Sequence, residues 1–415
     1  MLNTINKEYK RSTFILMLVL FVSQAIPGIY VRGILVNVCD VAITMLFVYT
    51  LLKKRAASRI FSNFFVLLTL FGIAAVLSVL VASIQERKLY VIAMLRTARL
   101  FLAPMLIYTI KTWREEVELK PIFLSCVLGG IVSGIFAIIM YWIQYPPYCA
   151  VQTLVKDGQM IYRAGGIQHN SSAFGAQMAL LFALCTWGWL NTEHRKQKIL
   201  FGMGILVSIA GVLCSFGRTP WIAMGLAVLF LIIRYRNREA ASLILVCTIC
   251  FATVFAVNSL GGSAQLMRQR MEIPAGSQQQ GSEQKVTQEE IDTYSSGRVS
   301  QLLCRVEQYM GNSQYYLTGS GFDIERDGLT YTCDCQYATS LVSMGVVGFA
   351  SMMALYLYWL FVLVKTRKED TRTWSLCFVT GIWHAITALT ADALCFSIST
   401  VAMAYVLVWF EEDAI

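Results

Sequence analysis

A succession of apolar segments, each about as long as a bilayer is thick, limits the folds that this chain can adopt. A helix that crosses the hydrocarbon core needs roughly 20 mostly apolar residues. Hydropathy predicts twelve such spans, at about 14–31, 34–52, 60–83, 89–110, 122–143, 171–190, 199–216, 219–234, 240–258, 337–364, 374–391 and 393–410, the last two of which could be re-entrant. Because helices satisfy their own backbone hydrogen bonds in lipid, the pattern predicts an all-α polytopic membrane protein.

Composition agrees with this fold class. Hydrophobic residues make up 57% of the 415 residues and charged residues 14%, whereas a soluble domain has about 25% charged residues. The first apolar run has no small-residue cleavage site, so we expect no cleavable signal peptide. The predicted inside loops are short and contain no Walker A motif. Residues 1–415 are therefore predicted to form one integral membrane domain, with no ATP-driven chemistry and no nucleic-acid partner.

The basic residues give the expected orientation. Lys and Arg residues cluster before the first span and after spans two, four, six, eight and ten, as at Lys53, Lys54 and Arg55. By the positive-inside rule, both termini are predicted to be cytoplasmic. Two extracytoplasmic loops follow, at about 144–170 and 259–336. The periodicity of residues 294–314 predicts a short amphipathic helix within the longer loop.

Two arginines inside the fourth span call for an explanation. Arg96 and Arg99 are spaced i, i+3, which places them on one helix face. They lie about 10–15 Å below the outer end of the span at 1.5 Å per residue. A charge at this depth is costly and should face a partner or a cavity. Asp40 lies at a similar depth and is a candidate partner for Arg96. The pattern leaves open a buried ion pair that fixes packing and an anion site below the outer headgroups.

Three more arginines are candidates for binding an anion. Arg163 lies in the sequence RAGGIQHN, just before the sixth span. Arg163 could instead be an interfacial residue that contacts lipid phosphate. Arg218 lies in a tight outer turn, SFGRTPW, and Arg298 opens the predicted amphipathic helix. In the same region His169 can either cap the sixth span or act as a base, and we favour capping.

The stretch from Gly319 to Gly348 brings carboxylates to the edge of the bilayer. Its first half is polar, and its second half turns apolar at Tyr337 and continues into the tenth span. The acidic residues in the polar half are Asp323, Glu325, Asp327 and Asp334. A carboxylate near a hydroxyl can act as a general base. The twelve cysteines show no zinc-ligand spacing, and we expect no metal site and no cofactor.

The order of these motifs resembles the O-antigen polymerase and O-antigen ligase superfamily of bacterial envelope polysaccharide synthesis. The matching residues are Arg163, Gly165, Gly166, Asn170 and Ala173, then Ser215, Gly217 and Arg218, then Gly297 and Arg298, and last Gly319, Gly321, Asp334, Tyr337, Gly345 and Gly348. The ligase branch has a histidine at the entry to the span after the long loop. Here this place holds Asp334 between two cysteines, which favours the polymerase branch.

The resemblance implies a GT-C-like, inverting, metal-independent glycosyltransferase of the bacterial inner membrane. It would polymerise oligosaccharide repeat units carried on undecaprenyl pyrophosphate into O-antigen, capsule or exopolysaccharide at the outer face. A flippase would supply the substrate and a chain-length regulator could bind. Its base would be Asp334, with Asp323 and Glu325 as further candidates, and Arg163, Arg218, Arg298, Arg96 and Arg99 would bind the pyrophosphate. The alternatives are a ligase that transfers finished glycan to a lipid or protein, and a transporter of the same lipid.

Overall fold

The chain is mainly helical. A computed structural model describes residues 2–31, 34–53, 62–146, 148–153, 160–235, 238–260, 298–324, 335–367 and 372–414. The helices within these ranges are α1 (Leu2–Ala25), α2 (Val38–Lys53), α3 (Asn63–Gln85), α4 (Val91–Thr97), α5 (Leu102–Thr112), α6 (Leu119–Trp142), α7 (Ser171–Asn191), α8 (Arg195–Ser215), α9 (Arg218–Tyr235), α10 (Arg238–Leu260), α13 (Arg298–Gly311), α14 (Gln336–Thr366), α15 (Arg372–Ala388) and α16 (Ser397–Ala414).

These helices lie close to the predicted spans. Each of the twelve predicted ranges contains helix, and the fourth is divided into α4 and α5. In the described part of the chain, seven helical segments are long and apolar enough to cross a membrane: Asn63–Gln85, Val91–Thr112, Leu119–Trp142, Ser171–Asn191, Arg195–Ser215, Arg218–Tyr235 and Gln336–Thr366. An all-α membrane protein is therefore supported. The number of twelve spans and a GT-C-like arrangement stay predictions.

The helix α7 forms the centre of the bundle. Of its apolar window, 94% is buried, which is typical of a helix that is hydrophobic all round. It packs against α8, α9 and α15. The indole Nε1 of Trp383 on α15 donates a hydrogen bond to the carbonyl oxygen of Ala176 on α7, at 2.8 Å. The helix is therefore surrounded by neighbours, and Trp383 fixes the part near its N-terminus.

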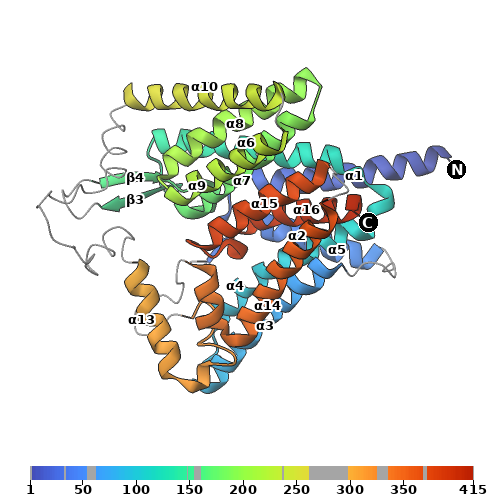
Figure 1. Cartoon of the computed structure of the whole chain (residues 1–415). Coiled ribbons are helices and arrows are strands. Elements are labelled where there is room, and N and C mark those ends of the chain that lie inside the picture. The colour runs from blue at the N-terminus through green and yellow to red at the C-terminus, as the bar shows by residue number, and fades with distance from the viewer. Residues whose placement is uncertain are drawn as a thin grey trace, which may run out of the picture.

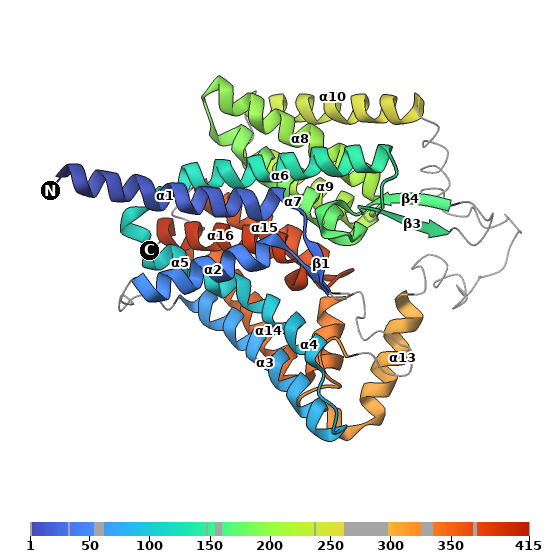
Figure 2. The same ribbon diagram turned by 180° about the vertical axis from the view of Figure 1, so that it is seen from behind.

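The two termini lie at one end of the bundle, as Figures 1 and 2 show. A hairpin of β3 (Cys149–Thr153) and β4 (Met160–Ala164) lies at the opposite end, together with α13. This arrangement agrees with the predicted separation of the termini from the 144–170 and 259–336 loops. The helix predicted at 294–314 is confirmed as α13. Which end faces the cytoplasm stays a prediction.

The first predicted span ends earlier as a helix, and the second begins later, than the hydropathy suggested. The helix α1 ends at Ala25, and an antiparallel pair of strands, β1 (Ile29–Val31) and β2 (Ile34–Val36), precedes α2. Pro27 cannot continue a helix, and it disfavours helical backbone at the residue before it. Hydropathy cannot separate a short apolar strand from a helix, so the predicted ends at 31 and 34 were wrong.

The long helix α14 is interrupted at Gly345, where φ is 68° and ψ is −166°. The backbone groups released by this break bond to the loop that precedes the helix: Ser320 N to Val342 O at 3.0 Å, Gly321 N to Ser343 O at 3.1 Å, Val346 N to Tyr316 O at 2.9 Å and Val347 N to Leu317 O at 3.3 Å. Polar backbone in a membrane is tolerated where protein satisfies it. The loop therefore completes the hydrogen bonds of the broken helix.

Glycines make this close backbone contact possible. A Cβ on Gly319 would lie 2.2 Å from the carbonyl carbon of Ser343, and one on Gly345 would lie 2.4 Å from that of Leu317. Gly319, Gly321 and Gly345 also have φ values of 75°, 100° and 68°, which side chains disfavour. We call these three residues the glycine interlock. They account physically for three glycines of the motif between Gly319 and Gly348.

Candidate functional site

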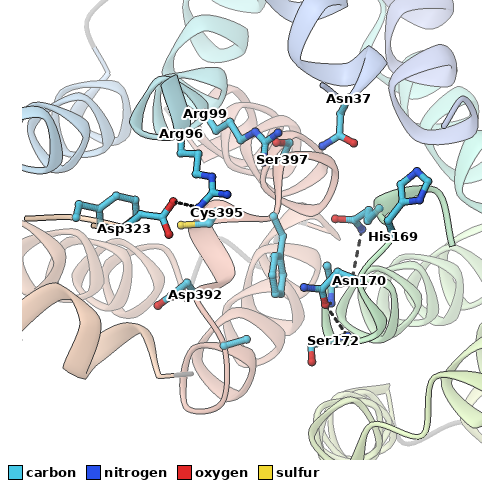
Figure 3. Close-up of a pocket in the computed structure, with 15 residues that line it drawn as sticks. Asn37, Arg96, Arg99, His169, Asn170, Ser172, Asp323, Asp392, Cys395 and Ser397 are labelled. Carbon is cyan, nitrogen blue, oxygen red and sulfur yellow. Dashed lines mark hydrogen bonds and ion pairs between the residues drawn. The ribbon is translucent and has the colours of Figure 1, made fainter. Parts of the chain in front are cut away.

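A cavity of about 380 Å³ lies between segments that are far apart in the sequence. Figure 3 shows the polar side chains around it. They come from the start of α2, from α4 and the following 3-10 turn η1 (Ala98–Phe101), from the start of α7, from the loop before α14 and from the α15–α16 connection. The lining residues are Asn37, Arg96, Arg99, Gln168, His169, Asn170, Ser172, Ala173, Phe322, Asp323, Ala391, Asp392, Cys395, Phe396 and Ser397.

Both arginines of the predicted fourth span line this cavity. The turn η1 separates α4 from α5 and contains Arg99, so the two arginines project from a break and not from one regular helix. Arg96 Nη1 lies 2.7 Å from Asp323 Oδ2, and Arg99 Nε lies 3.1 Å from Asp40 Oδ2. The partner of Asp40 is therefore Arg99, and the suggested pairing of Asp40 with Arg96 was wrong. The expectation that the two arginines face a cavity and partners is confirmed, and their depth in the membrane stays a prediction.

Three helices begin at the cavity. Asn37 precedes the first residue of α2, Asn170 is the N-cap of α7, and Phe396 and Ser397 stand at the start of α16. Each helix N-terminus carries roughly +0.5 elementary charge, so the three together add about +1.5 to the cavity. The two arginines face three carboxylates, those of Asp323 and Asp392 and that of Asp40, which pairs with Arg99 at the start of α2, so these side chains carry one net negative charge. Together with the helix termini this leaves a small positive charge of about +0.5, which still suits an anion.

Two buried polar groups in the lining are free to bind a ligand. Among the described residues, Asn37 Oδ1 and Ser397 Oγ have no hydrogen-bond partner. Both residues are more than nine-tenths buried, at 5% and 2% exposure. A buried polar atom without a partner is costly, so a ligand that bonds to it gains free energy. The serine hydroxyl can donate to a phosphate oxygen, and the amide oxygen can accept from a sugar hydroxyl.

The entry to α7 is capped by Asn170. Its Oδ1 accepts from Ser172 N at 2.9 Å and from Ala173 N at 3.0 Å. The neighbouring His169 lines the cavity in a left-handed conformation and packs on the Tyr148 ring, with 4.7 Å between the centroids. The favoured expectation that His169 caps this helix was therefore wrong. Asparagine is a preferred N-cap because its short side chain reaches the second and third amides.

The glycine interlock presents Asp323 to the cavity. Asp323 follows Gly321 by two residues and has a φ of 55°. The amide of Phe322, directly before it, donates to Ser78 Oγ of α3 at 3.0 Å. The backbone on the N-terminal side of Asp323 is thus fixed both to the break in α14 and to α3. Among the candidate bases predicted from the sequence, Asp323 is the one that lies in the described part of the chain, and it reaches Arg96.

The other predicted site residues lie elsewhere or outside the described residues. Arg163 on β4 donates from Nε to the carbonyl oxygen of Ser215, at 2.9 Å, and Arg218 begins α9. These two arginines therefore gather at the α8–α9 turn and are not among the cavity-lining residues. Arg298 is the first residue of α13, and its side chain is not described. Asp334, Glu325 and Asp327 lie outside the described residues.

Several lining residues were missed from the sequence. Asn37, Ser172, Asp392, Cys395 and Ser397 carry no motif, and they meet only because the α2, α7 and α16 starts converge. Asparagine and serine immediately before or within the first turn of a predicted helix are capping signals. Such signals at three predicted spans were available, but hydropathy does not show which helix ends lie together.

The α8–α9 turn is connected to the cavity through the α15–α16 connection. Thr390 Oγ1 donates to Thr219 Oγ1, at 2.8 Å, and Ala391 and Asp392 are the next residues along the chain. Thr219, the residue after Arg218, thus lies next to the segment that lines the cavity. The comparison with protein-family models finds no match for this chain, and the comparison with curated proteins finds none either.

Proposed function

We propose that this chain is a membrane glycosyltransferase that polymerises oligosaccharide repeat units carried on undecaprenyl pyrophosphate. The observation that carries the proposal is the cavity at which Arg96, Arg99 and three helix N-termini converge. Helix N-termini and guanidinium groups both favour phosphate oxygens. The cavity lies among helices that can span a membrane, so its ligand would be an anion attached to a lipid.

The size and polarity of the cavity suit a pyrophosphate with part of its first sugar. Ligand pockets commonly have volumes of roughly 300–1,000 Å³, and this one has about 380 Å³. Asn37, Asn170, Ser172 and Ser397 supply amide and hydroxyl groups for sugar hydroxyls. The rest of the oligosaccharide would extend from the end of the bundle that carries the β3–β4 hairpin and α13.

The proposed reaction uses the charges of the cavity. A hydroxyl at the non-reducing end of one unit attacks the anomeric carbon of another chain, and undecaprenyl pyrophosphate leaves. Negative charge grows on the leaving group, and preorganised positive groups stabilise it in the transition state. Asp323 is the candidate base among the cavity-lining residues, and Asp334 and Glu325 remain candidates by their place in the sequence. Of the remaining predicted phosphate ligands, Arg163 and Arg218 would act outside this cavity, and Arg298 remains a candidate by its place in the sequence.

The proposed setting is the outer face of a bacterial inner membrane, with both termini in the cytoplasm. A flippase would deliver the lipid-linked units, and a chain-length regulator would be a further partner. No nucleotide is consumed in this scheme, because the sugar is already activated by its bond from the anomeric carbon to the pyrophosphate leaving group. Arg96 and Arg99 take the electrostatic role that a metal ion has in many glycosyl transfers.

Transport of the same lipid is the second candidate, and two broken helices favour it. Discontinuous helices around a central ligand site are typical of secondary transporters. Here the α4–α5 segment is divided at η1, and α14 is broken at Gly345.

A ligase, which would transfer finished glycan to another acceptor, requires the same anion site but a different acceptor.

The banding of lipid-linked glycan in a strain without this chain separates the three candidates. For a polymerase, we expect single repeat units at the outer face and no ladder, with the ladder restored by the intact gene. A ladder that stays on undecaprenyl pyrophosphate would show a ligase. Single units that are accessible only from the cytoplasmic face would show a transporter. Either of the last two results would contradict the polymerase proposal.

A further inference from the structure

The ion pair between Arg96 and Asp323 is placed where a ligand can compete for it. The two side chains are 45% and 19% exposed and both line the cavity. Figure 3 shows the Asp323 carboxylate directed at the Arg96 guanidinium. Partly exposed ion pairs contribute little to the free energy of unfolding. Stability therefore does not explain why this carboxylate is held on this guanidinium.

Several backbone contacts next to Asp323 fix the position of this residue. Its backbone is left-handed, with a φ of 55°, a conformation that is uncommon for residues other than glycine. The glycine interlock fixes the chain two residues earlier, and Ser78 Oγ accepts from the amide of Phe322. Conformations of this kind persist only where the surrounding structure enforces them, and they cluster at functional sites.

A carboxylate and a phosphate group present the same kind of acceptor to a guanidinium. Both offer two oxygens that match the planar fork of arginine. Asp323 compensates part of the positive potential of the cavity when no anion is bound. A pyrophosphate ester carries more negative charge than one carboxylate, so it competes for Arg96 more strongly in the field of the three helix N-termini.

We propose that Asp323 occupies the anion site in place of the substrate, and that binding of the diphosphate displaces it from Arg96 and makes it the catalytic base. The identity of the ligand rests on the proposed function. In the displaced state, the acceptor oxygen forms a bond to the anomeric carbon, and its proton passes to an Asp323 oxygen. The bond from the anomeric carbon to the pyrophosphate oxygen breaks, and the electron pair leaves with the pyrophosphate. Donor binding thus precedes activation of the acceptor.

The exchange can be tested by binding alone. The full-length chain, purified in detergent, is titrated with inorganic pyrophosphate in low salt, and the Kd is measured by calorimetry. Asp323→Asn removes the internal competitor and keeps the shape of the side chain, and asparagine tolerates left-handed backbone. An exposed ion pair is worth at most about 1 kcal/mol, so we expect the Kd to fall by up to about fivefold. Arg96→Ala should raise the Kd.

A matched variant separates competition from a general change in charge. Asp392→Asn removes the same charge from the lining of the same cavity, but it leaves Arg96 paired with Asp323. We expect its effect on the Kd to be clearly smaller than that of Asp323→Asn. Equal tightening by the two variants, or an unchanged or weaker Kd for Asp323→Asn, would overturn the exchange. Equal thermal melting of the variants and the original chain shows that folding is unchanged.

A second measurement concerns catalysis. Asp323→Asn should abolish polymer in the glycan banding assay although it binds pyrophosphate more tightly, a combination that a purely structural role would not produce. Polymer at the original level in this variant would remove Asp323 as the base. The two proposals fail separately: a normal ladder in the deletion strain refutes the polymerase, and an unchanged Kd for Asp323→Asn refutes the exchange.

Discussion

Replacing Arg96 with alanine is expected to reduce polymer formation by roughly 10²–10³-fold, the effect of removing one preorganised group that stabilises developing charge. Arg96 lines the cavity and contacts Asp323 at 2.7 Å. In the proposed reaction its guanidinium binds the leaving pyrophosphate, whose charge is greatest in the transition state. The measurement is the rate of ladder formation by membranes that contain equal amounts of each variant.

Two control variants make this result specific. Arg96→Lys keeps the charge but loses the planar fork, so we expect an activity between those of alanine and arginine. Lys88→Ala removes an exposed cation from the turn between α3 and α4, which does not line the cavity, and should leave activity unchanged. Full activity in Arg96→Ala would show that this guanidinium does not bind the leaving group. Arg99→Ala is a less direct test, because it leaves Asp40 without its cation.

Replacing Gly345 with alanine is expected to destabilise the fold by about 3 kcal/mol or more. The backbone there has a φ of 68° and a ψ of −166°, a region that only glycine adopts readily, and strain of this kind costs on the order of 1–3 kcal/mol. The added Cβ would also lie 2.4 Å from the carbonyl carbon and oxygen of Leu317, which are main-chain atoms and cannot turn away. Overpacking adds on the order of 1–3 kcal/mol.

Gly225→Ala is the matched control for this substitution. Gly225 lies within α9, and a Cβ there would meet no atom within 4 Å. Alanine favours helix over glycine by up to about 1 kcal/mol, so this variant should be as stable as the original chain or slightly more stable. Thermal melting in detergent and the yield of monodisperse protein report both effects. Equal melting temperatures for the two variants would show that the backbone contact around Gly345 does not stabilise the fold.

Much of the helical framework follows from the sequence because long apolar segments have few alternatives in a membrane. The predicted positions of α3, α6 and α7 lie within a few residues of the observed helices. The strands β1 and β2 were missed because Ile29–Val31 and Ile34–Val36 are as apolar as the helices beside them. Their length and branched side chains, and Pro27 before them, are the only local signals.

The site was predictable only in part. Arg96 and Arg99 were found because a deep charge in a predicted span requires a partner, and Asp323 because it lies at a polar-to-apolar boundary. Asn37 and Ser397 were not found, since nothing in the sequence brings α2 and α16 together. The break at Gly345 was also missed, because hydropathy carries no information about the backbone angles of a single glycine. The contact with Gly319 that explains it lies 26 residues earlier in the chain.

The backbone hydrogen bonds between residues 316–321 and α14 have a consequence for biosynthesis. When α14 leaves the ribosome, its broken backbone still exposes the carbonyl groups of Val342 and Ser343 and the amide groups of Val346 and Val347. Each such group costs several kcal/mol in hydrocarbon without a partner. The loop that bonds to these carbonyl and amide groups is synthesised just before the helix, so it is already present when the helix forms. We therefore expect insertion of this span and docking of the loop to be one coupled event.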